Sequence, residues 1–251
     1  QGSDIKFTIT PSTDYELDTI KLDTKTVSEK DYTKSSTGVV TYTLKSVTKS
    51  QKVTVTFKKS NTTKNWKNPF NDVYASDSYY SAVKFVYENN LFKGTTTTKF
   101  APDTTMTRAM FVTVLGRLAG VDVSRFKTSS YSDVPINATT TWYAPYVEWA
   151  TQMGLVEGYG DGTFGPDNKI THQQMYQLMY KYTIFVENKK TNISGTSINA
   201  SDAEEVADWA KDAVKYASQQ NFLVKVGTSS RIDPTGEAKR SELAQLLEKY
   251  C

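Results

Sequence analysis

Three prolines, each set at the same distance before an amphipathic segment, constrain the fold of this chain more than any other feature. The tripeptides Phe100-Ala101-Pro102, Phe164-Gly165-Pro166 and Ile232-Asp233-Pro234 end six residues before Arg108, His172 and Arg240. The resulting period is about 64 to 68 residues, which is long for a solenoid repeat but fits a small helical unit. The spacing predicts three copies of one unit in tandem.

Each predicted unit contains two helices. An aspartate-containing turn opens each unit at Asp72, Asp133 and Asp202. Apolar residues at helical spacing follow in the first helix (Ala82, Val83, Val86; Tyr146, Val147, Ala150; Ala213, Val214, Ala217) and in the second (Phe111, Val112, Leu115, Leu118; Met175, Leu178, Met179, Tyr182; Leu243, Leu246, Leu247, Tyr250).

The first sixty residues have a different period. Apolar and polar residues alternate over 5–9, 19–22, 39–44 and 53–57, which predicts half-buried strands, and residues 11–14 and 35–38 supply turns. With "FTITPSTDYELDTIKLD" and "YTLKSVTKSQKVTVTF", this part resembles the internalin B-repeat type of bacterial surface module. The resemblance implies a spacer or stalk.

We therefore expect an α+β multidomain chain. A small all-β module occupies residues 1–60, a polar linker residues 61–68, and a mainly α-helical part residues 69–128, 129–195 and 196–251 as its three units. Gln1 follows no basic and apolar leader, so we expect any secretory signal to have been removed or to lie upstream.

Composition narrows the function. The chain has one cysteine, Cys251, and one histidine, His172, so a thiolate or histidine-pair metal site is not expected. A net charge of +3 is too small to indicate nucleic-acid binding, and no apolar run is long enough for a membrane span. Neither paired catalytic groups nor a phosphate loop is recognisable. We expect no enzyme activity, no metal and no cofactor.

Several motifs of the repeats are those of the S-layer homology (SLH) family. The second unit contains "YSDV" and "WYAPYVEWATQMGLVEGYGDGTFGPDNKIT", the first "FNDV", "LFKG", "FAPD" and "TRAM", and the third Asp202, Trp209, Pro234 and "KRSE". Residues 68–251 thus resemble three tandem SLH domains. The resemblance implies a pseudo-threefold bundle whose inter-unit grooves bind a wall polysaccharide, often with a pyruvate ketal on N-acetylmannosamine.

Departures from the family pattern predict that the three sites are not equivalent. Ser78 stands where the family usually has Trp, His172 stands where it has Arg, and Lys225 and Val226 replace the glycine found at Gly94 and Gly158. An imidazole is largely uncharged near neutral pH, so we predict that the groove of His172 binds weakly or not at all.

The start of the second helix is the best candidate for chemistry. Thr107 and Thr171 are good N-caps, and Thr171 with Gln174 fits a capping box. Arg108 and Arg240 follow directly, where free backbone N–H groups and the helix dipole favour a bound carboxylate or phosphate. The alternative is structural, in which either arginine pairs with an aspartate such as Asp72 or Asp202.

The family resemblance implies the remaining candidate residues. Asp72 and Asp133 would hold sugar hydroxyls or the neighbouring loop, Trp142 and Trp209 would line the grooves or else pack in the core, and Gly94 and Gly158 would let backbone N–H groups approach the sugar. An amine ligand would instead prefer Asp72, Asp133 and Asp202.

The expected function is non-covalent anchoring of a secreted protein to the bacterial cell wall, at the cell surface, through a pyruvylated wall polysaccharide. Two alternatives stay open. Related domains in outer-membrane envelopes bind peptidoglycan directly, sometimes through attached polyamines, and the units could also self-assemble laterally into a surface array. The module itself is expected to be monomeric.

Overall fold

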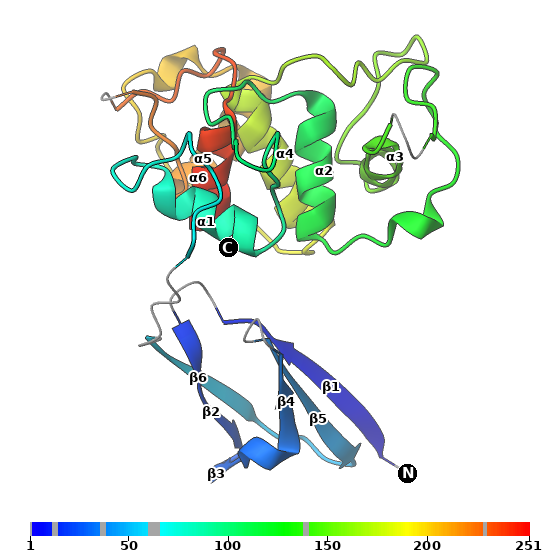
Figure 1. Cartoon of the computed structure of the whole chain (residues 1–251), viewed down its shortest axis with the longest axis vertical. Coiled ribbons are helices and arrows are strands. Elements are labelled where there is room, and N and C mark those ends of the chain that lie inside the picture. Colours follow the sequence, from blue (N-terminus) through cyan, green and yellow to red (C-terminus); the bar gives the residue numbers. More distant parts are fainter. Residues whose placement is uncertain (1, 12–14, 36–38, 60–65, 138–140, 228–229) are drawn as a thin grey trace. The chain divides into compact units, whose positions relative to one another are not determined.

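A computed structural model describes the chain except for residues 1, 12–14, 36–38, 60–65, 138–140 and 228–229. It divides into two compact units, Gln1–Lys67 and Asn68–Cys251 (Figure 1). Strands make up the first and helices the second, which confirms a mixed α+β fold.

The first unit contains two three-stranded antiparallel sheets. One has the order β1 (Ser3–Ile9), β5 (Val40–Val47), β4 (Tyr32–Lys34), and the other β3 (Lys25–Thr26), β2 (Tyr15–Leu22), β6 (Val53–Lys59). Leu17 and Ile20 from β2 and Val40, Tyr42 and Leu44 from β5 form one core between the sheets.

The four predicted strand segments lie in β1, β2, β5 and β6 within one residue, whereas the short β3 and β4 were not predicted. Residues 12–14 and 36–38 of the predicted turns, and residues 61–65 of the predicted linker, lie outside the described residues.

Within the residues that the structure describes, the second unit contains six α-helices at the predicted places. They are α1 (Tyr80–Glu88), α2 (Arg108–Leu118), α3 (Ala144–Gln152), α4 (His172–Phe185), α5 (Lys211–Gln219) and α6 (Arg240–Tyr250). Their apolar stripes are buried: Val83, Leu115 and Leu243, for example, are fully enclosed. Burying one such side chain stabilises a fold by about 1.5 to 3 kcal/mol.

The helices pack between the predicted units rather than within them. The principal pairs are α1 with α6, α2 with α3 and α4 with α5, and α1 and α6 lie side by side in Figure 1 although they stand at opposite ends of this unit's sequence. Gly116 of α2 makes one close approach possible, because an added Cβ would collide with the ring of Tyr146 on α3. The second helix of each predicted unit therefore packs on the first helix of the next, and α6 packs on α1.

The helix starts interlock in the same order. The first residue of α2 donates its backbone N–H to Asn168 O (2.9 Å), that of α4 to Gly236 O (3.0 Å) and that of α6 to Thr104 O (3.0 Å). Isolated bridges join Thr107 to Lys169, Thr171 to Glu237 and Thr105 to Lys239. Backbone donors that a helix leaves unpaired at its start are thus satisfied by the loop of another repeat.

Candidate ligand-binding site

Three aspartates fix the loops on which the second helices rest. Both oxygens of Asp72 accept backbone N–H groups, from Phe100 and Ala101 (each 2.9 Å). Asp133 does the same with Phe164 and Gly165 (each 2.8 Å), and Asp202 with Ile232 (3.0 Å) and Asp233 (2.8 Å). Of the two roles expected for Asp72 and Asp133, holding the neighbouring loop is the one these contacts perform.

These loops place one residue in the left-handed region before each proline. The φ angles are +58° at Ala101, +67° at Gly165 and +46° at Asp233. A residue with a Cβ is strained there by about 1 to 2 kcal/mol, and the two hydrogen bonds to the aspartate carboxylate help to offset this strain. The carbonyl of the preceding residue is then free to accept a hydrogen bond from another repeat.

Arg240 uses such a carbonyl. Its side chain is only 6% exposed, with Nε donating to Phe100 O and Nη2 donating to Lys93 O (both 2.8 Å). The guanidinium also lies over the rings of Phe92 and Phe100, at 4.9 and 4.7 Å. Burial is the main cause that lowers the pKa of Arg240 to about 10. The negative charge of Asp72 opposes this shift and the positive charge of Arg117 adds to it. The guanidinium therefore stays charged at neutral pH.

Arg108 repeats this geometry in a more open setting. Its Nε donates to Phe164 O (3.0 Å) and its Nη2 to Glu157 O (2.8 Å), with Phe164 and Tyr159 below it at 4.4 and 5.3 Å. In the described part of the chain, neither Arg108 nor Arg240 forms an ion pair with a carboxylate. The direct partners of both arginines are thus backbone carbonyls, and Asp72 influences Arg240 only through its charge.

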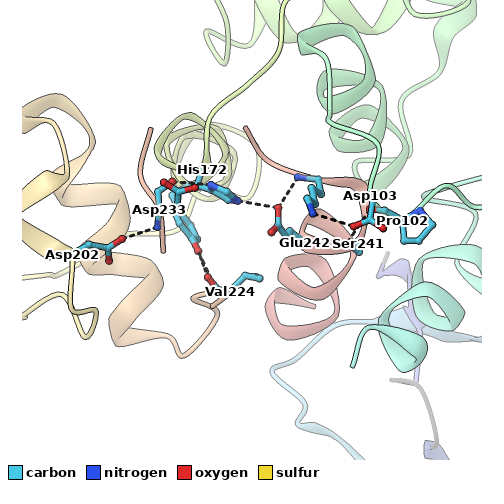
Figure 2. Close-up of polar contacts among 10 residues, drawn as sticks. Pro102, Asp103, His172, Asp202, Val224, Asp233, Ser241 and Glu242 are labelled. Atoms are coloured by element: carbon cyan, nitrogen blue, oxygen red, sulfur yellow. Dashed lines mark hydrogen bonds and ion pairs between the residues drawn. The ribbon is translucent and has the colours of Figure 1, made fainter. Parts of the chain in front are cut away.

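His172 is buried and bound on both sides (Figure 2). Its Nδ1 lies 2.8 Å from Asp233 O and its Nε2 2.9 Å from Glu242 Oε2, and the side chain is 2% exposed. Burial would lower its pKa, but the Glu242 carboxylate and the Asp233 carbonyl outweigh burial and raise it. Both ring nitrogens face acceptors, which favours the imidazolium more than the sequence-based expectation of a largely uncharged ring allowed.

A cavity of about 380 Å³ lies beside Arg240, within the range of ligand pockets. Its charged lining is cationic, from Lys93, Arg117 and Arg240, and its apolar lining comes from Phe92, Met110 and Val114. Gly94 and Trp142 also line it. The cavity therefore brings together three of the predicted site residues, Arg240, Gly94 and Trp142, from three different predicted units.

The two predicted tryptophans lie on the surface. Trp142 is 48% and Trp209 53% exposed, so the alternative that they pack in the core is wrong. Only Trp142 is among the residues that line the described cavity. An exposed indole beside a cavity offers a flat apolar face of the kind that a sugar ring can cover.

The glycines and N-caps have local roles. A Cβ at Gly94 would collide with Thr96 O and the Phe70 ring, and one at Gly158 with Thr163 O and the Tyr131 ring, so both positions need glycine for internal packing. Their approach to a sugar stays a prediction. Thr107 caps α2 by accepting the N–H of Met110, and Thr171 with Gln174 forms the predicted capping box of α4.

Two further residues were not singled out from the sequence. Glu242 pairs with His172 and also accepts the backbone N–H of Lys239 (2.7 Å), and Arg117 lines the cavity. An acid stands at position 242 of α6, whereas the matching positions of α2 and α4 hold Met110 and Gln174, and this difference could have drawn attention to Glu242.

The geometry is that of an interlocked helical module with a cationic, aromatic-rimmed cavity, as in a binding protein. The sequence model of the S-layer homology domain matches residues 69–110 and 130–175. A third unit at 196–251 and the β repeat stay predictions.

Several proteins of known name are similar over most of the chain. The chain is 25% identical over 182 residues to the S-layer protein sap of Bacillus anthracis (72% of this chain, 21% of that protein). It is 25% identical over 192 residues to a cellulosome-anchoring protein of Acetivibrio thermocellus (76% and 40%), and 26% over 188 residues to an endoglucanase of Bacillus sp. strain KSM-635 (75% and 19%). The chain thus spans well under two thirds of each of these relatives.

These matches establish a cell-surface anchoring module of a secreted, surface-attached protein. The similarity to the endoglucanase covers a small share of that protein and is consistent with a non-catalytic part. In the described residues, no helix is long and apolar enough to cross a membrane, and no cluster of three or more His, Cys, Asp or Glu could hold a metal.

Proposed function

We propose that the helical unit anchors its protein to the cell wall by binding an acidic wall polysaccharide, with a pyruvylated sugar in the cavity beside Arg240 and Trp142. Three tandem SLH units at 69–128, 129–195 and 196–251 would form a pseudo-threefold bundle, and the β module at 1–60 would be a spacer. The repeated aspartate, arginine and helix-start contacts support this arrangement.

One observation carries the choice of ligand. Arg240 is a buried cation whose described partners are carbonyls and aromatic rings, in a cavity lined by three cations and no carboxylate. Asp72 favours the charge of Arg240 without forming an ion pair with it, and an acidic ligand would supply a counter-ion in direct contact with the buried guanidinium. The bidentate fork of an arginine also suits a carboxylate.

Arg108, Gly158 and Trp209 are proposed to line a second groove. Thr107 and Thr171 would place the arginine and histidine at the helix starts, as they cap α2 and α4. The groove at His172 is proposed to be inactive, for a reason different from the one inferred from sequence: Glu242 already satisfies its cation. Multivalent attachment to a polymer would add avidity.

The test is co-sedimentation of the full chain with purified cell walls, before and after hydrofluoric acid removes the polysaccharide. Trp142→Ala is the informative variant and Trp209→Ala its match, because both side chains are about half exposed and neither change should unfold the protein. We expect Trp142→Ala to reduce binding more strongly. Full binding of the wild type to stripped walls would refute the proposal.

Direct peptidoglycan binding through a polyamine has one observation in its favour. An open hollow of about 570 Å³ is lined by Asp72, Asp77 and Asp103 with Tyr74 and Tyr79. Asp103 is, however, paired with Lys239 (3.0 Å), and Asp72 and Asp77 accept backbone N–H groups. Binding to stripped walls that Asp77→Asn abolishes would favour this function.

A further inference from the structure

Arg117 is a second guanidinium in the cavity of Arg240. It lies near the end of α2, is half-buried, and its Nη1 donates to Leu91 O at 3.1 Å. That bond joins α2 to the turn after α1. In the described residues, no carboxylate forms an ion pair with Arg117.

The matching residues of the other repeats show what this position does structurally. Nine residues after the first residue of α2, α4 and α6 stand Arg117, Lys181 and Lys249. Lys181 donates to Gly154 O (3.4 Å) and Lys249 to Leu223 O (2.7 Å). A basic side chain thus secures the turn after the first helix in each repeat, and a lysine is sufficient for that contact.

An arginine at this position has donors to spare. The guanidinium carries five N–H groups in a planar fork, and the contact with Leu91 O uses one of them. Arg117 and Arg240 both line the cavity, and they are close enough for the charge of Arg117 to lower the pKa of Arg240. The repulsion between them falls when an anion lies between them.

Resting on the function proposed above, we propose that Arg117 is a ligand-binding residue and that the acidic group of the sugar is held between the guanidinium groups of Arg117 and Arg240. The ligand class is a saccharide with an oxyanion substituent, either a carboxylate or a phosphate. The sugar ring would lie toward Trp142 at the edge of the cavity, and Arg117 would provide a contact that the lysines of the other repeats cannot reproduce.

The experiment measures the affinity of the full chain for three probes by calorimetry. They are N-acetylmannosamine, its pyruvate ketal and its 6-phosphate. Arg117→Gln should weaken binding of the acidic probes by about 10-fold to 100-fold, as expected for a lost charge-assisted hydrogen bond, and leave the neutral sugar unchanged. Arg117→Lys keeps the charge and the contact with Leu91 O, and should lose less.

Lys249→Gln is the matched control, since it removes the equivalent turn contact at Leu223 O and no side chain of the cavity. It should lower thermal stability about as much as Arg117→Gln while affinity stays within about twofold. Tighter binding of the pyruvate ketal would indicate a carboxylate ligand, and tighter binding of the 6-phosphate would indicate a phosphate ligand.

The outcomes separate the two proposals. If Trp142→Ala abolishes binding of the acidic probes while Arg117→Gln binds them as the wild type does, the proposed function stands and the role of Arg117 is overturned. If the wild type binds neither acidic probe, both proposals fail. Equal losses in Arg117→Gln and Lys249→Gln would show that Arg117 acts only through the turn.

Discussion

The Nε2 atom of His172 lies 2.9 Å from Oε2 of Glu242 and joins the first turn of α4 to the first turn of α6. At the matching starts of α2 and α6 an arginine stands in place of the histidine and donates to carbonyls. One of the three helix starts is therefore closed by an internal ion pair, while the other two leave their cations without a carboxylate partner among the described residues.

This pair predicts how stability depends on pH. The contacts raise the pKa of His172 from 6.5, so its contribution is complete below about 6.5 and is lost as the pH rises through the raised value. Burial would raise the pKa of Glu242, but His172 and the N–H of Lys239 lower it from 4.5, so its contribution is lost as the pH falls through the lowered value. The pair should stabilise most between these limits.

Glu242→Gln is the variant that tests this. The glutamine keeps the capping contact, as Gln174 does in α4, and removes the charge. We expect a loss of about 1 to 3 kcal/mol near pH 5.5 and a smaller loss near pH 9, measured by urea unfolding of the helical unit. The other charged groups that act on this pair are Asp233, which adds to the raised pKa of His172, and Lys239, which adds to the lowered pKa of Glu242. An equal loss at both pH values would contradict the charged pair.

The aspartates of the loops predict a second stability effect. Asp202→Ala removes the acceptor of two backbone N–H groups in a buried position. Leaving such donors unsatisfied costs about 1 to 3 kcal/mol each. Thermal unfolding should show a clear decrease, whereas Glu204→Ala, at an exposed neighbour, should change little. Wall binding measured below the unfolding temperature should fall in proportion to the unfolded fraction.

The left-handed residues give a matched pair of substitutions. Ala101→Gly removes a strained Cβ at φ +58° and should stabilise the helical unit by up to about 1 kcal/mol. Gly165→Ala introduces the strain at φ +67°, and its Cβ would lie 2.6 Å from Asn168 Nδ2, so it should destabilise the unit by more than 1 kcal/mol or so. Chemical unfolding measures both, and equal effects of one sign would contradict the proposed strain.

Much of the helical architecture could be predicted from the sequence because it is local. Apolar spacing located all six helices, and Thr171 with Gln174 identified the capping box. The partners of the arginines could not be predicted in this way: Arg240 donates to Phe100 O across 140 positions of sequence. Every residue type has a backbone carbonyl, so the sequence does not show which residue accepts the hydrogen bond of an arginine.

The state of His172 illustrates the same limit. Its usual pKa led to the expectation of a neutral ring, whereas the acid that charges it stands 70 positions away on another helix. In the β unit, β3 and β4 contain two and three residues, too few to show an alternation. Their pairing depends on the neighbouring strands and not on their own pattern.

The packing of α6 on α1 determines how the helical unit would respond to mechanical load. Gln245 and Glu248 near the end of α6 contact Ser78 and Ser81 at the start of α1, so tension between Asn68 and Cys251 would act on the same end of this helix pair. Load of this kind breaks the contacts one after another, so we expect α6 to separate from α1 first, at low force, before the other helix pairs open.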